Sequence, residues 1–378
     1  MRHRTERPFG MNRKRIFRLG VLTGGGDCPG LNAAIRAITK SALNDFCWQV
    51  FGIEDGFEGL VEGRMRELMN ADVSGIINLG GTILGTSSRG DPWHYPVQTA
   101  RGRTRIADVS GRALGHFSGA KLDALIAIGG DGTMNIALKF AKLGLPVVGV
   151  PKTIDNDLAA TDITFGHDTA VSIAAEAIDR LHTTASSHHR VMVIEVMGRY
   201  AGWIALTAGL AGGADIILIP EIPFRWKPVF HKVRERNTLG KRFSIVCVAE
   251  GVQCPGVGVI VKGYDQKRTD PKQLGGVGAY VARKIALGTR VETRVTVLGH
   301  LQRGGGPTAF DRNLATKFGV AATRAVHDGK FGTMVALQGS EIVPVPREKA
   351  VAGLNLVPLN HPLLAAARSV GTSFGDEG

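Results

Sequence analysis

The sequence predicts an α/β protein with two doubly wound domains, each built on a mostly parallel sheet that carries helices on both faces. Short apolar runs of strand length alternate with longer segments of helical periodicity along most of the 378 residues. This alternation is typical of parallel sheets whose strands are joined by helices. The 51 glycines suit the many tight strand-to-helix turns of such a sheet. With 44% hydrophobic residues, the chain is long enough to bury two cores.

The individual elements follow from the same two periodicities. Strands are expected where aliphatic residues run without interruption, and helices where apolar residues recur every three or four positions, as in 168–184. The expected strands are 16–23, 49–53, 122–128, 145–150, 190–196, 216–219, 243–249 and 295–299. The expected helices are 31–43, 99–117, 134–142, 168–184, 200–210, 228–239, 279–287 and 309–327, while 264–278 is expected to be a loop.

The charge distribution favours small anionic substrates over nucleic acid. The net charge is +13, but the basic residues are scattered except in the first 15 positions. No interleaving of aromatic and basic residues and no DNA-binding signature accompanies them. Residues 1–15 are not rich in serine, as a transit peptide would be, and are expected to form a disordered basic leader.

Apolar run lengths and cysteine spacing bear on location. No apolar run reaches the roughly 18 residues that a membrane span needs, so no membrane partner is expected. The four cysteines have no CxxC spacing, which favours reduced thiols in a cytoplasmic protein.

Polar motifs follow nearly every expected strand. In doubly wound sheets, ligands bind at the carboxyl ends of the strands, so these motifs are expected to converge on one site. The motifs are Gly24–Gly30, Ile76–Arg89, Gly129–Thr133, Pro151–Asp157, Met197–Arg199, Glu250–Gly251 and His300–Gly305.

The segment Gly129–Thr133 has the composition of a magnesium–polyphosphate site. An apolar run leads into Gly-Gly-Asp-Gly-Thr, and a helical segment follows. Glycines allow the backbone to approach a bulky anion, and a helix N-terminus offers it unpaired N–H groups. Because Asp131 would repel that anion, a cation is expected between them.

A second acidic cluster lies in Thr153–Asp157. In an extended loop the side chains alternate, so Asp155 and Asp157 point to the same side. Phosphoryl transfer needs both a metal to neutralise the polyphosphate and a base to orient the attacking hydroxyl. Taken alone, the cluster also fits an ordinary Asn/Asp turn.

Four arginines and one histidine lie beside expected strand ends. Arginine binds phosphate or carboxylate with a planar fork, although a surface salt bridge would explain any single one. His300 near Arg303 is a candidate for binding a sugar phosphate. The arginines are Arg190, Arg199, Arg294 and Arg303.

Five of these motifs occur in the order and spacing of the 6-phosphofructokinases, and the sequence resembles that family from about Leu19 to about Lys330. They are Gly-Gly-Asp-Gly-Thr (129–133), Pro-Lys-Thr-Ile-Asp-Asn-Asp (151–157), Met-Gly-Arg-Tyr (197–200), Ala-Glu-Gly (249–251) and Leu-Gly-His-Leu-Gln-Arg-Gly-Gly (298–305). The resemblance implies phosphorylation of fructose 6-phosphate at its 1-hydroxyl, a step of glycolysis.

The resemblance also implies roles for single residues. Asp155 would be the general base with Thr153 beside it, and Arg199 would steady the transferring phosphoryl group. Mg²⁺ would be held by Asp131, with Asp157 nearby. Nucleotide phosphates would be contacted by Gly26, Arg89, Gly130, Asp131, Gly132 and Thr133. The sugar phosphate would be bound by Thr153, Asp155, Met197, Gly198, Arg199, Glu250, His300 and Arg303.

In the family, two further arginines reach in from a neighbouring subunit, and they match Arg190 and Arg294. The resemblance therefore implies a homo-oligomer with shared active sites, usually a tetramer among the bacterial enzymes.

Two positions bear on the phosphoryl donor. Family members that use pyrophosphate usually have Asp at the position of Gly132 and Lys at that of Lys152, so this chain is mixed. An aspartate at 132 would crowd and repel the α-phosphate of ATP, whereas Lys152 only adds a cation. We expect ATP as co-substrate, with pyrophosphate as the alternative donor.

The chain departs from the family at other positions. Phe57 stands where an adenosine-stacking tyrosine is common, and because a ring is retained, stacking on adenosine is expected to survive. In the effector site of bacterial relatives, several arginines and a glutamate are replaced, although Arg36 and Lys241 remain. Fewer guanidinium groups imply weak or altered effector control. The replacements are Lys40, Asn70, His182 and Asp215.

Three other hypotheses about the function remain open. A lipid or NAD kinase shares the Gly-Gly-Asp-Gly core but lacks the later motifs. An inactive, effector-binding subunit would be expected to lack Asp155 or Asp131, and both are present. A nucleic-acid binder would rest on the basic leader alone.

The predicted division gives a larger nucleotide-binding domain and a smaller sugar-phosphate domain. The larger comprises 16–166 with 302–352, and the smaller comprises 167–301 with 353–378.

Overall fold

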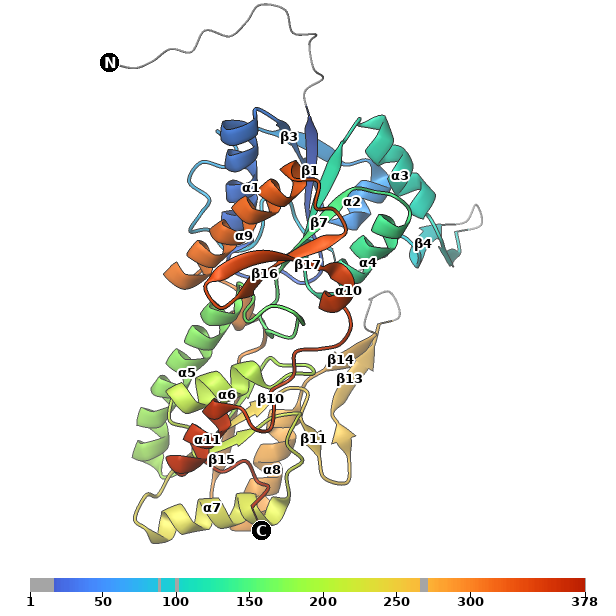
Figure 1. The fold of residues 1–378 in the computed structure, drawn as a ribbon. Helices are drawn as coiled ribbons and strands as arrows, with labels where there is room; N and C mark the ends of the chain where they lie inside the picture. The colour runs from blue at the N-terminus through green and yellow to red at the C-terminus, as the bar shows by residue number, and fades with distance from the viewer. Residues whose placement is uncertain (1–16, 88–89, 99–101, 266–270, 378) are drawn as a thin grey trace, which may run out of the picture.

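The computed structural model describes residues 17–87, 90–98, 102–265 and 271–377 (Figure 1). The predicted leader at 1–15 and the candidate phosphate contact Arg89 lie outside these residues. The chain folds into two lobes, an upper and a lower one in the view of Figure 1, each with a sheet flanked by helices. The predicted fold class, with two mostly parallel sheets, is confirmed.

The upper lobe contains a seven-stranded sheet whose inner strands are parallel. The two outermost pairs, β2–β3 and β16–β17, are antiparallel. Register places Thr23 beside Ile128 and Gly129 beside Pro151, so three neighbouring strands end at one edge of the sheet. In spatial order the strands are β17 (Glu341–Pro346), β16 (Thr333–Gln338), β7 (Val147–Pro151), β6 (Ala124–Gly129), β1 (Arg18–Thr23), β2 (Gln49–Ile53) and β3 (Met65–Leu68).

The lower lobe contains a fully parallel sheet of four strands. Ala249 lies beside Val196, and Val297 beside Glu195, so three of these strands also end level with one another. Their order is β15 (Thr293–Val297), β8 (Val191–Val196), β10 (Ser244–Ala249) and β9 (Ile216–Leu218).

Helices cover both faces of each sheet because the strand side chains alternate between two buried layers. In the upper lobe, α1 (Leu31–Phe46) and α9 (Ala309–His327) cover one face, opposite α2 (Phe57–Glu62), α3 (Ser110–Gly119) and α4 (Asp131–Lys142). In the lower lobe, α5 (His167–His188) and α6 (Trp203–Ala211) lie opposite α7 (Trp226–Thr238) and α8 (Val277–Thr289). Short elements are the 3₁₀ helix η1 (Gly299–Arg303), α10 (Arg347–Ala350) and α11 (Pro362–Ser369).

Two predicted segments were wrong. Within the described part of 99–117, only the segment from Ser110 onwards is helical, because Thr104–Ala107 forms β5 and pairs with β4 (Tyr95–Gln98). The helix starts later because Asp108 accepts the N–H of Ser110 at 2.8 Å, which caps the first turn. The predicted loop at 264–278 contains part of a hairpin of β13 (Val261–Tyr264) and β14 (Lys272–Leu274), next to a pair formed by β11 (Gln253–Cys254) and β12 (Gly258–Val259).

The two lobes meet at the start of α5 and α9. The Thr308 hydroxyl donates to Asp168 at 2.6 Å, and the buried Asp311 accepts the N–H of Thr169 at 2.8 Å. Each sheet draws its strands from within one of the two predicted domains. The exact domain boundaries stay a prediction.

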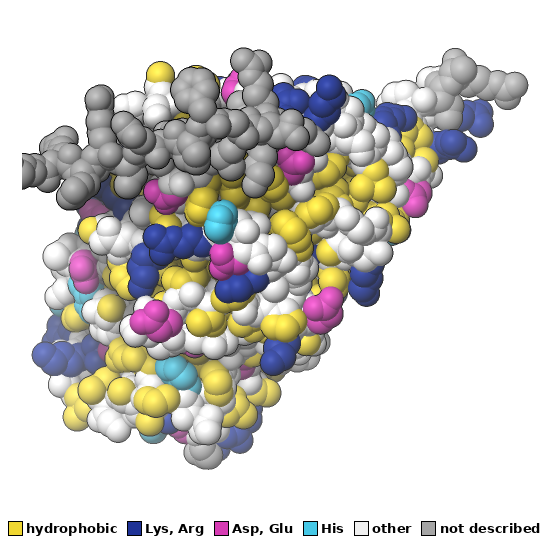
Figure 2. Space-filling model, turned by 45° about the horizontal axis from the view of Figure 1, so that its top comes forward, with side chains coloured by type: hydrophobic (Ala, Val, Ile, Leu, Met, Phe, Trp, Pro, Cys, Tyr) yellow, Lys and Arg dark blue, Asp and Glu magenta, His cyan; other side chains and the backbone are white. Residues whose placement is uncertain are grey.

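The surface agrees with the scattered charge of the sequence. On the face shown in Figure 2, Lys and Arg side chains are interspersed with Asp, Glu and apolar groups. Within the described residues, no helix is long and apolar enough to cross a bilayer.

Candidate functional site

The first wall of the site is the loop between β6 and α4. Gly130 is extended, and Asp131 is the first residue of α4. The unpaired N–H groups at the N-terminus of this helix therefore lie close to the Asp131 carboxylate. Asn135 donates to the Asp131 carboxylate at 3.0 Å from one turn further on. Thr133 is buried against Gly24, where an added Cβ would lie 2.7 Å from its hydroxyl oxygen. Glycine at this position therefore lets the two loops pack together.

The second wall is the loop that follows β7. The Thr153 hydroxyl accepts the N–H of Asp155 at 3.1 Å, which turns the chain at the acidic cluster. Asn156 has a left-handed backbone with φ 52°, and its side-chain oxygen accepts the N–H of Thr164 at 2.9 Å. This conformation is costly for a residue other than glycine, so the contacts around Asn156 determine how Asp155 and Asp157 are presented.

Asp155 is a strongly perturbed carboxyl group of the site. Burial, reinforced by the charge of Asp157, raises its pKa to about 7, against the opposing effect of Arg303. Its Oδ1 is buried and has no hydrogen-bond partner among the described residues. A buried carboxylate oxygen without a donor is costly, and such groups cluster at functional sites.

Two further carboxyl groups share this environment. Burial is the main cause that raises the pKa of Asp131, and the negative charge of Asp157 adds to it. The pKa of Asp157 is also raised by burial. The mutual repulsion would be relieved by a cation, and carboxylate oxygens are the protein ligands that Mg²⁺ prefers. Within the described part of the chain, no group of three or more His, Cys, Asp or Glu side chains forms a metal site.

Two cationic side chains contact the loop 24–30. Lys152 is 3% exposed and donates to the carbonyl of Gly26, and burial lowers the pKa of its ammonium group. Arg303 donates to the carbonyl of Asp27 at 3.0 Å. A Cβ on Gly26 would lie 2.8 Å from the Arg303 guanidinium, so a side chain here would displace that guanidinium from its present position. The loop 24–30 is thereby lined with positive charge.

The lower lobe supplies the facing wall. Met197 follows β8 and donates its N–H to Gln302 at 2.8 Å, and Gly198 has φ 136°. Arg199 donates to the carbonyl of Lys272 on β14. Glu250 follows β10, and burial is the main cause that raises its pKa. Because the charges of Glu250, Arg199 and Arg303 all act on Asp155, the two lobes share one electrostatic environment.

Two predicted arginines pair with one carboxylate at the edge of the lower sheet, and the predicted histidine is exposed. Arg190 and Arg294 both pair with Glu292, at 2.8 and 2.6 Å, at the edge of the lower sheet formed by β15. His300 is exposed in η1. Within this one chain, the two arginines are held together and do not line the acidic centre.

Some site residues were missed by the sequence reasoning. Gln302 is fully buried and accepts the backbone N–H of Met197. This role was not predicted, although Gln302 lies inside the motif His300–Gly305. Asn135, one turn beyond Asp131, could have been found from the spacing. Asn355 contacts the loop at 156–157 from about 200 residues away, and no local pattern signals it.

The structure bears on two expectations about ligand contacts. Phe57 is 4% exposed and packs against Phe140, so its ring is not available to stack on adenosine in this structure. In the predicted effector site, Asp215 pairs with Arg236 at 2.8 Å, and His182 Nε2 lies 2.7 Å from the carbonyl of Gly212. Both groups are engaged within the chain, which fits weak effector binding, but that binding stays a prediction.

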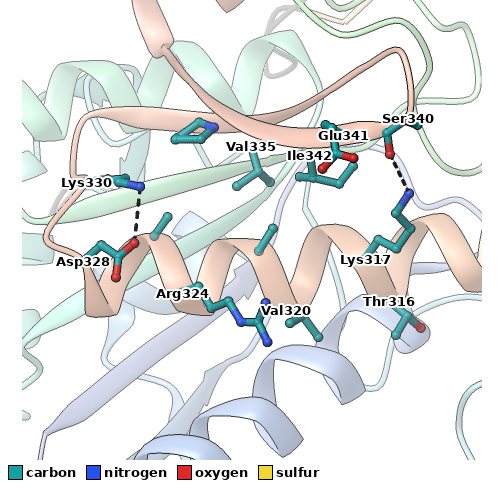
Figure 3. Close-up of a pocket in the computed structure, with 13 residues that line it drawn as sticks. Thr316, Lys317, Val320, Arg324, Asp328, Lys330, Val335, Ser340, Glu341 and Ile342 are labelled. Atoms are coloured by element: carbon teal, nitrogen blue, oxygen red, sulfur yellow. Dashed lines mark hydrogen bonds and ion pairs between the residues drawn. The ribbon is translucent and has the colours of Figure 1, made fainter.

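A groove elsewhere on the upper lobe lies outside the candidate site. It has a volume of about 460 Å³ and lies between α9 and the hairpin of β16 and β17 (Figure 3). Lys317 and Lys330 at its rim are engaged by the Ser340 carbonyl and by Asp328. None of the predicted site residues lines it.

The phosphofructokinase family model matches residues 18–326. The chain belongs to the phosphofructokinase family. An ATP-dependent 6-phosphofructokinase from Chloroflexus aurantiacus is 53% identical over 361 residues, which cover 95% of this chain and 98% of that protein.

Other phosphofructokinases extend the comparison. ATP-dependent 6-phosphofructokinase 2 of Clostridium perfringens is 46% identical, covering 96% of this chain and 99% of that protein. A pyrophosphate–fructose 6-phosphate 1-phosphotransferase from Amycolatopsis methanolica is 52% identical, covering 90% of this chain and 96% of that protein. The structure of Pichia pastoris phosphofructokinase in the T-state matches with a TM-score of 0.76 and 30% identity, over 96% of this chain and 37% of that longer one.

Proposed function

We propose that this phosphofructokinase transfers a phosphoryl group from ATP to the 1-hydroxyl of fructose 6-phosphate, giving fructose 1,6-bisphosphate. The observation that carries the proposal is Asp155. Its buried Oδ1 has no hydrogen-bond partner among the described residues, and the charges of Asp157, Arg303 and Arg199 all act on its carboxyl group. An aspartate with a raised pKa can accept the hydroxyl proton during the attack on phosphorus.

The residues around Asp155 have complementary roles in the proposal. Thr153 fixes the turn that presents Asp155. The start of α4 and the loop containing Gly26 receive the nucleotide phosphates through backbone N–H groups, with Gly130, Gly132 and Thr133 at the helix start. Arg199 comes from the facing lobe and neutralises charge that develops on the transferring group.

Mg²⁺ fits the acidic pair on this structure's own evidence. Burial and the charge of Asp157 raise the pKa of Asp131, burial raises that of Asp157, and the oxygens of both are hard ligands suited to a small divalent cation. When bound, Mg²⁺ would neutralise the polyphosphate charge that faces these carboxylates. Asn135 keeps the Asp131 carboxylate oriented for this role.

The sugar phosphate pocket is assigned to Met197, Gly198, Glu250, His300 and Arg303. Arg190 and Arg294 would complete the pocket of a second copy, because Arg294 projects from the edge strand β15 and Arg190 pairs with Glu292 just before that strand. This strand also has exposed apolar residues such as Val297, which is 51% exposed. We therefore propose a homo-oligomer with shared active sites, a tetramer by analogy with bacterial relatives. A cytoplasmic location fits an enzyme of ATP and sugar phosphates.

The choice between ATP and pyrophosphate as phosphoryl donor depends on two residues. Gly132 lies in the first turn of α4, where a carboxylate would face the α-phosphate of ATP. Lys152 favours the second candidate, pyrophosphate, yet its buried ammonium group is already engaged by the Gly26 carbonyl. ATP is also the donor in the names of relatives with 53% and 46% identity, while the 52% identical relative is named for pyrophosphate.

Side-by-side turnover with ATP and with pyrophosphate tests the proposal. Wild type is expected to use ATP and fructose 6-phosphate. Gly132→Asp should lower kcat/KM for ATP about 100-fold, because a like charge next to a phosphate costs several kcal/mol. Gly132→Ala, which adds a side chain without charge, is the matched control and should retain most of the ATP activity. Turnover with pyrophosphate but not with ATP would contradict the proposed donor.

A further inference from the structure

A short strap of the chain, residues 354–357, crosses between the lobes next to the acidic loop 153–157. After α10, residues 354–357 leave the upper lobe and lead towards α11 on the lower lobe (Figure 1). Leu354 forms an antiparallel bridge with Leu158, directly after the acidic cluster. The backbone N–H of Asn355 donates to the carbonyl of Asp157 at 2.9 Å. The strap is therefore attached to the loop that carries Asp155 and Asp157.

Asn355 adds a side-chain contact at the most constrained point of that loop. Its Nδ2 donates to the carbonyl of Asn156 at 2.9 Å. Asn156 is the left-handed residue between the two aspartates, with φ 52°. Holding its carbonyl fixes the peptide that joins Asn156 to Asp157, and with it the relative orientation of the two carboxylates.

The same strap is attached to the facing wall of the site. The carbonyl of Asn355 accepts the indole N–H of Trp203 at 2.7 Å. Two residues later, the N–H of Val357 donates to Glu221 at 2.9 Å, and the same carboxylate accepts the N–H of Gly202. Gly202 and Trp203 follow Arg199 by only three and four positions, at the start of α6.

We propose that Asn355 is a positioning residue for phosphoryl transfer, which holds the loop of Asp155 in register with the loop of Arg199 across the boundary between the lobes. The inference rests on the proposed function. Three polar groups of one residue are used, two towards the upper loop and one towards the lower lobe. A group that only fixes relative geometry should affect the chemical step more than ground-state binding.

Two variants isolate the side-chain contact. Asn355→Ala removes it, and Asn355→Asp keeps the size of the side chain but replaces the N–H donor with an acceptor facing the Asn156 carbonyl. Both should lower kcat about tenfold, with KM for fructose 6-phosphate and for ATP changed less than about twofold. Leu356→Ala, an exposed neighbour on the same strap, is the control and should leave both constants unchanged.

A further variant, at Trp203, tests the link to the lower lobe. Trp203→Phe removes the indole donor to Asn355 while keeping an aromatic ring. If the strap joins the two walls, the effects of Asn355→Asp and Trp203→Phe on kcat should be less than multiplicative when the two changes are combined. Wild-type kcat in Asn355→Asp, a loss expressed only in KM, or fully multiplicative effects would each overturn the inference.

Hydrogen exchange gives a readout that does not depend on turnover. Backbone amides of 153–164 should exchange faster in Asn355→Asp than in wild type, and those of Leu356→Ala should not. Wild-type protein without turnover on either donor would overturn the proposed function, while unchanged exchange in Asn355→Asp would overturn the positioning role by itself.

Discussion

At the scale of single residues, the candidate base is held in a costly environment. Asp155 is partly buried beside Asp157, and its buried Oδ1 has no hydrogen-bond partner among the described residues. Its pKa in the folded protein, about 7, exceeds the ordinary value of 3.8. The folded state therefore binds more protons than the unfolded state between these values, so this group lowers the free energy of unfolding as the pH rises towards neutral.

Asp155→Asn should consequently stabilise the substrate-free and metal-free protein while removing activity. The expected gain is about 1–3 kcal/mol at pH 8, because the neutral amide removes a buried, unpartnered negative charge. The gain should be smaller at pH 5, where the wild-type carboxyl is protonated. Denaturant unfolding at the two pH values measures it, with the exposed Asp179→Asn as the control. Equal destabilisation at both pH values would refute the argument.

At the scale of elements, α10 joins the strands and helix that carry the acidic loops. Arg347 at its start is fully buried and donates to the carbonyls of Ala137 in α4, Val147 in β7 and Thr333 in β16, at 3.2, 2.7 and 3.0 Å. Burial lowers the pKa of its guanidinium to about 10. One planar fork thus links three elements, two of which end in the candidate site.

Arg347→Met should lower the free energy of unfolding by about 3 kcal/mol, because three buried carbonyls lose their donor. Arg347→Lys should recover only part of this loss, since an ammonium group lacks the fork geometry. Lys349→Met, an exposed change in the same short helix, should be nearly neutral. Chemical denaturation of the three variants measures the effect, and a neutral Arg347→Met would exclude the proposed link.

Element prediction from sequence succeeded where local periodicity decides the structure. Helix α9 was expected at 309–327 and is observed at Ala309–His327, because its apolar stripe is long and Thr308 caps it. The failure at 99–117 has an equally local cause, since β5 depends on its partner β4. Arg347 could not have been assigned, because its partners are backbone carbonyls up to 210 residues away.

At the scale of the whole molecule, the candidate site was predictable to the extent that it follows strand ends. The register of β1, β6 and β7 brings Gly26, Asp131 and Asp155 to one edge, as expected for a parallel sheet. The roles of Asn355 and Gln302 depend on how the two lobes meet, which no local pattern encodes. The same limit applies to Arg190 and Arg294, whose predicted site lies in another copy.

Mixing two inactive variants tests that shared site at the level of the assembly. Asp155→Ser removes the base of its own site, and Arg294→Ala removes the cation offered to the neighbouring site, so each homo-oligomer should lose at least about 100-fold in kcat/KM. In a hybrid, the site with an intact Asp155 receives an intact Arg294 from the other chain.

Co-expression with two different tags, followed by tandem purification, isolates these hybrids. Random pairing would restore about a quarter of the sites, and purified hybrids should show more, because each mixed pair contains one complete site. The matched control combines Asp155→Ser with the double variant Asp155→Ser and Arg294→Ala, which cannot form a complete site in any pairing. Hybrids of the first kind that are no more active than this control would place Arg294 in its own chain's site or outside the active site altogether.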